Sequence, residues 1–185
     1  MTGWGKKGSD YYYFEDGVGL KGTKDFGGVS YMFTYGKCNS KYPFVAAADL
    51  ANSIVKERNI TTLYSAFTYA AVLNYQKIQI NVDESILPGY CASFIYSNGY
   101  GDCRCMASIF YYLAKELGYN AHVVIGKVPY ASGGYGLHSW VEIDTGNGTY
   151  VYDPQFNHQY NGVGGYAFQY GTSGTWQYTD YYRIN

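Results

Sequence analysis

The chain has 185 residues and a formal net charge of -1, which suits one domain together with a small additional unit. Its 13 basic and 14 acidic side chains form no basic run, so neither a nucleic acid nor another polyanion is expected as a partner. No apolar run is long enough to span a membrane. The 25 tyrosines and 24 glycines are typical of extracellular surfaces that contact sugars or peptides, and equally of a β-rich domain with many turns.

Residues 1–37 contain a weak internal repeat with an offset of 19 residues. Each unit predicts a turn, a short aromatic strand and a second turn, and one unit alone cannot bury its aromatic face. We therefore expect two hairpins that cap the main domain, with an independent binding module as the alternative. The recurring residues are Gly3 and Gly22, Gly8 and Gly27, Tyr12 and Tyr31, Phe14 and Phe33, and Gly17 and Gly36.

The hydrophobic pattern after the repeat becomes helical. Residues 45–55 and 61–73 each predict a helix, because their apolar side chains recur at helical spacing. Residues 76–82 alternate between polar and apolar side chains and predict a strand or an extended segment. The clearest helix covers residues 103–117, where four apolar residues form one stripe.

Four strands are predicted in the last third of the chain, at residues 121–128, 137–143, 149–153 and 181–184. The turn sequence Asp-Thr-Gly-Asn-Gly at residues 144–148 should join the second and third of them as a hairpin. Helices followed by an antiparallel sheet indicate an α+β fold class.

The four cysteines are Cys38, Cys91, Cys103 and Cys105. Cys38 and Cys91 could form a disulfide in a secreted chain, and four free thiols are the alternative. Cys103 follows the helix cap Asp102, where unpaired backbone N–H groups and the helix dipole favour a thiolate. Cys105 lies about 160° around the same helix, so it is expected to pack in the core. The two cysteines have no second pair nearby, so no metal site is predicted.

His138 and Trp140 share one face of their predicted strand, since strand side chains alternate with period two. The hairpin turn pairs residues whose numbers add to about 293, which places Asp153 across from Trp140 and one diagonal step from His138. A carboxylate beside an imidazole orients the ring and supports its protonated form. The order Cys103, His138, Asp153 thus predicts a nucleophile, a base and an orienting group. The other two histidines are weaker candidates for the base: His122, on a strand, and His158, in a polar loop.

The segments that carry these residues resemble the core of the transglutaminase-like superfamily of papain-related thiol enzymes. The resemblance covers about residues 45–160 and implies a helix packed on an antiparallel sheet. It also implies that Cys103 is the nucleophile, His138 the base and acid, and Asp153 the orienting residue. Papain-related enzymes take an oxyanion donor from just upstream of the cysteine, so two candidates are Asn98 and Tyr100. The matching motifs are Gly101-Asp102-Cys103 with Ala107, Leu117-Gly118, His138-Ser139-Trp140-Val141-Glu142 and Asp153-Pro154.

Residues 1–37 resemble the cell-wall-binding repeats of Gram-positive bacterial surface proteins, among them choline-binding repeats. In that family, aromatic side chains of successive hairpins bind choline or glycan. The second unit departs from the pattern, with Thr23 in place of the tryptophan. The resemblance implies a wall-binding-like unit over residues 1–37 and a catalytic domain over residues 38–185. The motifs that carry it are Thr2-Gly3-Trp4, Tyr11-Tyr12-Tyr13-Phe14 and Asp16-Gly17.

A triad of this kind forms a thioester acyl-enzyme from an amide, and it needs no cofactor. Water as the acceptor makes the enzyme a peptidase or amidase, whereas a lysine amine makes it a transglutaminase that joins Gln to Lys. The small size and the wall-type repeats favour the bacterial branch, so we expect a secreted cysteine hydrolase of peptide or isopeptide amides. A non-catalytic wall-binding protein is the third interpretation. Candidates for the substrate cleft are Trp140, Gly134 and Tyr135.

These resemblances imply a location outside the cell or on the cell wall. The N-terminus at Met1 shows no signal-peptide core, so we expect that the native leader has been removed. Expected partners are a peptide or protein substrate and, through residues 1–37, bacterial cell-wall glycan.

Overall fold

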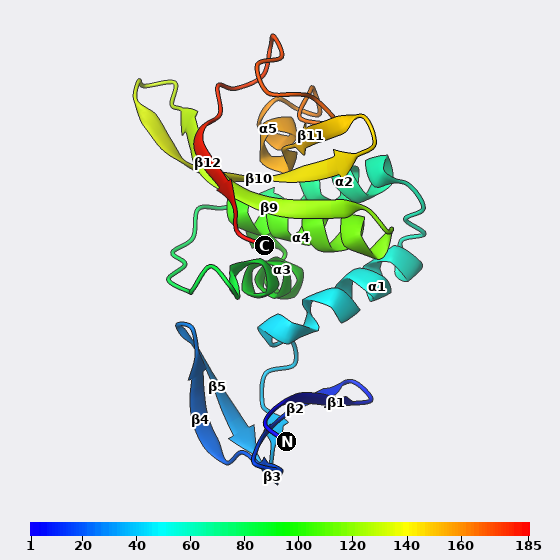
Figure 1. Cartoon of the computed structure of the whole chain (residues 1–185), viewed down its shortest axis with the longest axis vertical. Helices are drawn as coiled ribbons and strands as arrows, with labels where there is room; N and C mark the ends of the chain where they lie inside the picture. The colour runs from blue at the N-terminus through cyan, green and yellow to red at the C-terminus, as the bar shows by residue number, and fades with distance from the viewer.

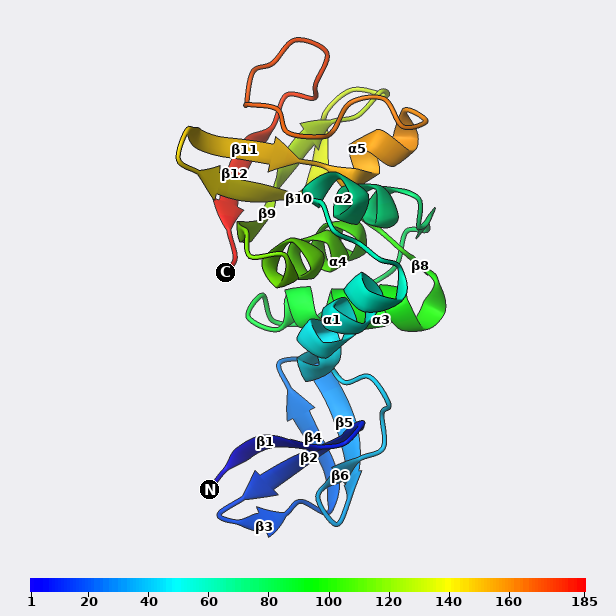
Figure 2. The same cartoon turned by 90° about the vertical axis from the view of Figure 1, so that its right-hand side faces the viewer.

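The computed structural model describes all 185 residues. Its first 38 residues form a sheet of short strands that projects from an α+β body, as Figures 1 and 2 show. The order in this hairpin sheet is β1-β2-β6-β5-β4, with β3 paired to β2. Both strands of the β4–β5 hairpin begin 19 residues after those of the β1–β2 hairpin. The strands are β1 (Gly3–Lys7), β2 (Asp10–Glu15), β3 (Val18–Gly19), β4 (Gly22–Phe26), β5 (Val29–Thr34) and β6 (Lys37–Cys38).

The aromatic side chains of the hairpin sheet pack inward. The ring centroid of Trp4 lies 5.0 Å from that of Phe26 and 5.5 Å from that of Phe33. Phe33 is buried in one cluster with Leu50, which comes from the first helix of the body. The hairpin sheet therefore covers one end of the body. Its last strand, β6, ends at Cys38, one residue beyond the domain boundary expected at residue 37.

Three of the five helices of the body, α1, α2 and α4, lie where the sequence predicts helices. The pattern of residues 87–98 makes no such prediction for α3, because this helix buries seven of its 12 residues and has no polar face to contrast with an apolar one. Its start is marked by Pro88 in the first turn, and its end by Gly99 at a φ of 75°. The five helices are α1 (Ala47–Glu57), α2 (Leu63–Ala71), α3 (Leu87–Asn98), α4 (Cys103–Glu116) and α5 (Pro154–Gln159), and a 3-10 turn at Phe44–Ala46 precedes α1.

Residues 76–82 do not form the predicted strand. The two-residue strands β7 (Asn74–Tyr75) and β8 (Tyr100–Gly101) pair in parallel, and residues 76–86 then continue without helix or strand. Its backbone is bonded at its two ends, since the Gln76 N–H donates to the Gly101 carbonyl at 2.8 Å and the Asp83 N–H donates to the Gly27 carbonyl at 2.7 Å. The alternating pattern of residues 76–82 suits a strand, but a strand also needs a neighbouring strand to pair with, and the pattern does not show whether one is present.

The antiparallel sheet of the body has the order β11-β10-β9-β12. Val141 pairs with Tyr152, which confirms the predicted register of the β10–β11 hairpin. The predicted α+β fold class is confirmed as well. The strands are β9 (Asn120–Pro129), β10 (Tyr135–Thr145), β11 (Gly148–Tyr152) and β12 (Thr179–Arg183).

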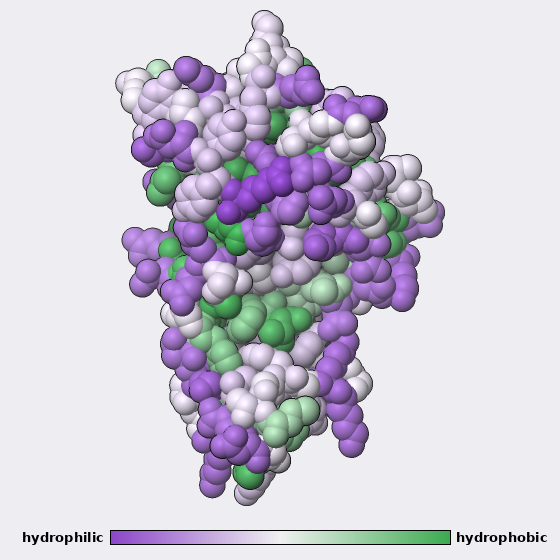
Figure 3. Space-filling view, in the orientation of Figure 1, coloured by the Kyte–Doolittle hydropathy of each residue, from purple (hydrophilic) through white to green (hydrophobic).

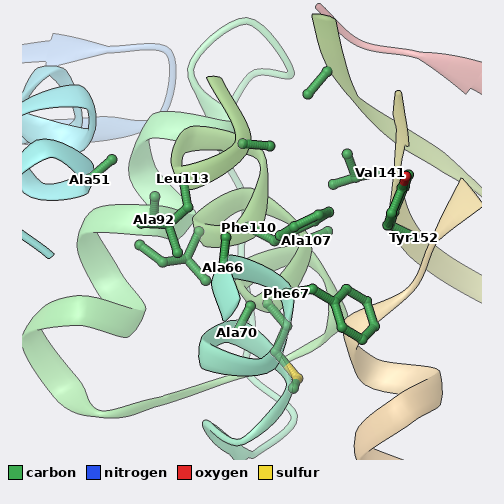
Figure 4. Close-up of a cluster of buried hydrophobic side chains, with 14 of the residues drawn as sticks. Ala51, Ala66, Phe67, Ala70, Ala92, Ala107, Phe110, Leu113, Val141 and Tyr152 are labelled. Carbon is green, nitrogen blue, oxygen red and sulfur yellow. The ribbon is translucent and has the colours of Figure 1, made fainter. Parts of the chain in front are cut away.

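Helix α4 lies at the centre of the body, between the sheet and the other helices (Figure 2). Its residues Phe110 and Leu113 meet Phe67 of α2 and Val141 of the sheet in the main core, which Figure 4 shows. Phe67 and Phe110 pack edge to face, with ring centroids 5.5 Å apart. A second cluster, which the chain between α5 and β12 covers, consists of Val124, Val128, Trp140, Val151, Phe168 and Tyr178.

The surface shows one apolar band and no membrane element. In Figure 3 the hydrophobic surface gathers at mid-height, over α3 and beside the hairpin sheet. Tyr90 and Phe94 of α3 are only partly buried. None of the helices has both the length and the apolar character that a membrane crossing would need.

Candidate active site

Cys103 is the first residue of α4, and its side chain lines a cleft of about 1120 Å³. Asp102 caps this helix, since its Oδ1 accepts a hydrogen bond of 3.0 Å from the backbone N–H of Arg104. The N–H groups of Arg104 and Cys105 both donate to Asp102, so the N–H of Cys103 itself and the positive end of the helix dipole are what favour a thiolate here. The Arg104 guanidinium pairs with the Asp102 carboxylate, so the cap leaves no isolated negative charge beside Cys103.

His138 lies between Asp153 and Cys103. Its Nε2 is 2.7 Å from Oδ2 of Asp153, and both side chains are buried. Cys103 is the other neighbour of this ring, close enough to act on the imidazole pKa, and it lines the same cleft. Because Nε2 is bonded to Asp153, Nδ1 is the ring nitrogen left to face the thiol. The fold thus brings together the three residues that the sequence analysis singles out.

The β10–β11 hairpin and the start of α5 together hold Asp153. Tyr152 ends β11, and Asp153 then leaves the strand to cap α5, with its Oδ1 accepting a hydrogen bond of 2.9 Å from the Phe156 N–H. Pro154 occupies the first position of α5, where no backbone N–H is required. The carboxylate is therefore fixed by the helix cap on one oxygen and by His138 on the other.

The surroundings of His138 favour its protonated form. Burial by itself would lower the pKa of the imidazole, but the nearby Asp153 and Cys103, through charge and hydrogen bonds, raise this pKa from 6.5 to about 10. The direction of this shift favours the imidazolium form at neutral pH. An imidazolium beside a cysteine stabilises the thiolate, which is the nucleophilic form of the residue.

Three aromatic residues enclose the His138–Asp153 pair. Tyr178 donates its hydroxyl to Oδ2 of Asp153 at 2.8 Å. Trp140 stacks on the imidazole with ring centroids 5.8 Å apart, and Trp176 packs against it edge-on at 5.1 Å. Trp176 and Tyr178 are absent from the sequence-based candidates. Their spacing of two residues just before β12, which puts both on one face of an extended segment, is the signal that could have found them.

The three residues expected to line the cleft have different positions. Tyr135 lines it, whereas Gly134, in the same β9–β10 turn, is not among its residues. Trp140 is completely buried behind His138, where its Nε1 donates to the Tyr170 hydroxyl at 2.7 Å. Trp140 therefore supports the imidazole from behind and has no surface for a substrate. The alternation along β10 predicts the face on which Trp140 lies, but it does not predict that the C-terminal segment covers that face.

The cleft is lined by 23 residues, of which 14 are hydrophobic. They come from residues 75–87, from the start of α4, from β9 and β10 with the turn between them, and from α5 with the C-terminal segment. Such a lining suits apolar or aromatic groups of a substrate. Its aromatic members are Tyr75, Tyr130, Tyr135, Tyr160, Trp176 and Tyr182.

Neither of the two suggested oxyanion donors lies in the cleft. Asn98 is exposed at the end of α3, where its Nδ2 donates to the Phe94 carbonyl at 2.8 Å, and Tyr100 packs against the Phe94 ring. Asn98 ends α3 and Tyr100 lies in β8, and both side chains pack against Phe94 of α3 rather than lining the cleft with Cys103. The side-chain amides that do line the cleft are those of Gln155 and Gln159, at the two ends of α5.

All four cysteines are free thiols, so Cys38 and Cys91 form no disulfide. Cys38 belongs to the cluster of the hairpin sheet, whereas Cys91 lies beside Cys105 in the main core. Burial and the contact with Cys105 raise the pKa of the Cys91 thiol well above its usual value. Cys105 is completely buried, as expected of a packing residue. No group of three or more histidine, cysteine or acidic side chains is arranged to hold a metal ion.

The two other histidines bond to backbone carbonyls away from the cleft. Nδ1 of His122 is 2.9 Å from the carbonyl oxygen of Asn185. His158 lies in α5 rather than in the expected loop, and its Nδ1 is 2.9 Å from the carbonyl oxygen of Ala71. His138 is thus the imidazole that stands next to Cys103.

Comparison with known proteins identifies the core of this chain. Among solved structures it is similar to (BACCR)NAT3, an arylamine N-acetyltransferase from Bacillus cereus with a Cys-His-Glu catalytic triad, at 17% sequence identity and a TM-score of 0.34. That likeness covers 62% of this chain and 42% of the other, so it spans about two fifths of that enzyme. No curated protein matches the chain. Residues 48–154, more than half of the chain, match the family model of the transglutaminase-like superfamily. The chain therefore belongs to the transglutaminase-like superfamily.

Proposed function

We propose that the protein is a cysteine hydrolase that cleaves peptide or isopeptide amides through Cys103, His138 and Asp153. The observation that carries this proposal is the position of His138, which is bonded to Asp153 on one side and reaches Cys103 on the other. Membership of the superfamily supports a thiol enzyme, and the cleft beside Cys103 offers space for a substrate. Each of the three residues has a role that an acyl-enzyme mechanism requires.

In the first half-reaction, the Cys103 thiolate attacks the carbonyl carbon of the substrate amide. Negative charge moves to the carbonyl oxygen near the Cys103 N–H at the start of α4, and one such donor lowers a barrier by about 3 kcal/mol. The C–N bond then breaks, and Nδ1 of His138 gives its proton to the leaving amine. A thioester remains on Cys103, and His138 is neutral.

In the second half-reaction, water is the acceptor. Neutral His138 takes a proton from the water while the water oxygen attacks the thioester carbonyl. Cleavage of the C–S bond releases the carboxylic acid and restores the thiolate and the imidazolium. Asp153 keeps its bond to Nε2 in both steps, so the ring holds one orientation throughout.

The cleft favours a polymer over a small molecule as the substrate. Its volume of about 1120 Å³ exceeds the range of about 300–1,000 Å³ that is usual for small-molecule pockets. Most of its lining is hydrophobic, and it includes the ring of Tyr135 and that of Trp176, which packs against His138. The proposed substrate is therefore a peptide chain with apolar or aromatic side chains near the scissile amide.

Incubation of the wild type and Cys103→Ala with casein, with and without a fluorescent amine, tests this function. Hydrolysis produces casein fragments that carry no label and are absent with the variant. Incorporated label without fragments would instead show transamidation, the other reaction that the same thioester permits. Silence in both assays, together with a Cys103 that iodoacetamide labels no faster than a free thiol, would contradict an enzyme and favour a non-catalytic wall-binding protein.

An extracellular or wall-associated location in a Gram-positive bacterium is part of the proposal. It is supported by the resemblance of residues 1–37 to wall-binding repeats. Tyr12 and Phe14 alternate with the inward-packed residues of β2, and their rings stack with centroids 6.4 Å apart, so this pair is the proposed surface for a glycan. Wild type should sediment with purified Gram-positive cell walls and Tyr12→Ala should not. Failure of the wild type to sediment would leave residues 1–37 with a capping role alone.

A further inference from the structure

Residues 76–86 form one side of the substrate cleft without a helix or strand to hold their shape. A segment of this kind keeps its position only where other parts of the chain fix it. We call residues 76–86 the cleft wall. Its members that line the cleft are Lys77, Ile80, Val82 and Glu84.

Both ends of the cleft wall are tied to the body. At its start, the Arg104 guanidinium donates to the carbonyl of Ile78 at 3.0 Å. At its end, the Tyr182 hydroxyl donates to the Glu84 carboxylate. Between these bonds, Ile80 and Val82 pack against the main core, and the backbone beside Val82 has one further contact.

The tip of the β4–β5 hairpin makes that contact. The carbonyl of Gly27 accepts a hydrogen bond of 2.7 Å from the backbone N–H of Asp83. Gly27 and Gly28 form the tight turn between the strands at φ values of 56° and 91°, and Asp25 accepts a bond of 3.0 Å from the Gly28 N–H. The tip is therefore rigid, and Figure 1 shows it pointing away from the rest of the hairpin sheet toward the body.

The contact is so close that it needs glycine. A Cβ at Gly28 would lie 2.5 Å from the carbonyl oxygen of Asn81, and one at Gly27 would lie 2.7 Å from the Asp83 carboxylate. In the first hairpin the equivalent residues are Gly8 and Ser9, and a Cβ at Gly8 would meet nothing within 4 Å. The second hairpin alone is thus shaped to meet the cleft wall.

We propose that the tip of the β4–β5 hairpin is a positioning element of the substrate cleft, which sets substrate affinity by fixing the apolar side chains of Ile80 and Val82. This inference rests on the proposed hydrolase function. It assigns the hairpin unit a part in the active site, because Gly27 and Gly28 hold the backbone on which those side chains stand. The chemistry at Cys103 does not depend on the contact, so binding and bond cleavage should respond differently when it is lost.

The test compares Gly28→Ala with Gly22→Ala. Both glycines have positive φ values, 91° and 100°, so both variants carry similar backbone strain, but a Cβ at Gly22 would meet nothing within 4 Å. We expect Gly28→Ala to raise KM for fluorescein-labelled casein by roughly five- to tenfold with kcat changed less than about twofold. Gly27→Ala should have a similar effect, because its Cβ would lie 2.9 Å from Cβ of Asp83, which cannot move without its backbone. Gly22→Ala should match the wild type in KM.

Hydrogen exchange supplies a readout that needs no substrate. In Gly28→Ala the amide of Asp83 should exchange roughly tenfold faster than in the wild type and in Gly22→Ala, whereas exchange in α4 stays unchanged. Alkylation of Cys103 by iodoacetamide should be equal in all variants, which also shows that they are folded. Equal Asp83 exchange in Gly28→Ala and Gly22→Ala would overturn the inference.

The two readouts separate this inference from the proposed function. If wild type leaves casein intact, the proposed substrate class is wrong, and the exchange of Asp83 still decides whether the tip fixes the cleft wall. If casein is cleaved with the same KM in every variant, the hydrolase stands and the positioning role of the tip is refuted.

Discussion

At the scale of single residues, Cys103 and Cys105 have the same side chain and very different surroundings. Cys103 is half-buried at the cleft beside the His138 imidazole, and Cys105 has no exposed surface. We expect iodoacetamide to alkylate Cys103 rapidly and selectively below pH 7, because the start of α4 and the neighbouring His138 favour the nucleophilic form of the thiol. Trypsin cuts between the two at Arg104, so mass spectrometry of the peptides assigns the label. A labelled Cys105 with a silent Cys103 would reverse the assignment.

The pKa of His138 predicts how stability depends on pH. This pKa is about 10 in the folded chain against an ordinary 6.5, so the folded state holds the proton more tightly than the unfolded one. The resulting stability is complete below about pH 6.5 and is lost as the pH rises through about 10. The free energy of unfolding should fall over this interval, and less so in Asp153→Asn, which lacks the charge. Urea unfolding at several pH values measures the free energy of unfolding of the wild type and of Asp153→Asn. If that free energy fell equally with pH in the two proteins, the charged His138–Asp153 pair would be contradicted.

Tyr178 is a positioning residue, because it acts through Asp153. Tyr178→Phe keeps the ring and removes the hydroxyl, so we expect kcat to fall about three- to tenfold at little change in KM, with a stability loss of about 1 kcal/mol. Tyr11→Phe is the matched control, since the hydroxyl of Tyr11 in β2 also donates to a carboxylate, that of Asp49 in α1. It should lose similar stability and keep full kcat. If kcat were the same in Tyr178→Phe and Tyr11→Phe, Tyr178 would have no role in positioning Asp153.

At the scale of elements, α4 begins at the nucleophile, so its N-terminal cap serves both stability and reactivity. Asp102→Ala removes the acceptor for the Arg104 N–H and should cost about 1 kcal/mol of unfolding free energy. Asp102→Asn keeps that acceptor and should cost less, although it loses the ion pair with Arg104. Urea titrations of the two variants provide the comparison. If both lost the same stability, the ion pair rather than the cap would hold the start of α4.

Elements differ in how well their own residues predict them. The stripe of α4 and the turn of the β10–β11 hairpin are local patterns, and both elements were predictable from spacing alone. Helix α3 has no such pattern, because it is buried by neighbours on several sides. Residues 76–82 show the converse case, since their strand-like alternation has no partner strand to pair with.

At the scale of the whole molecule, the hairpin sheet and the body share one buried cluster, in which Phe33 meets Leu50 of α1. Phe33→Ala should therefore cost about 3–5 kcal/mol and lower the stability of the entire chain in a single transition. Met32→Ala, at the exposed neighbouring position, should have little effect. Calorimetry decides, because an independent hairpin unit would unfold in a separate transition and Phe33→Ala would shift that one alone.

The sequence by itself determined the fold class, the start of α4 at Cys103, and the register that brings Asp153 to His138. These follow from helical periodicity, a cap and a turn, all of which act within a few residues. The roles of these three residues in catalysis stay predictions until they are tested.

Only the tertiary structure decided which surfaces meet. It turned Trp140 behind the imidazole, carried Tyr178 to Asp153, left Asn98 outside the cleft, and set Gly28 against Asn81. Each of these contacts either joins segments that lie apart in the chain or depends on α3, a helix that no local pattern predicts. Local periodicity fixes the direction of a side chain relative to its own element, and the packing of whole elements decides what that side chain touches.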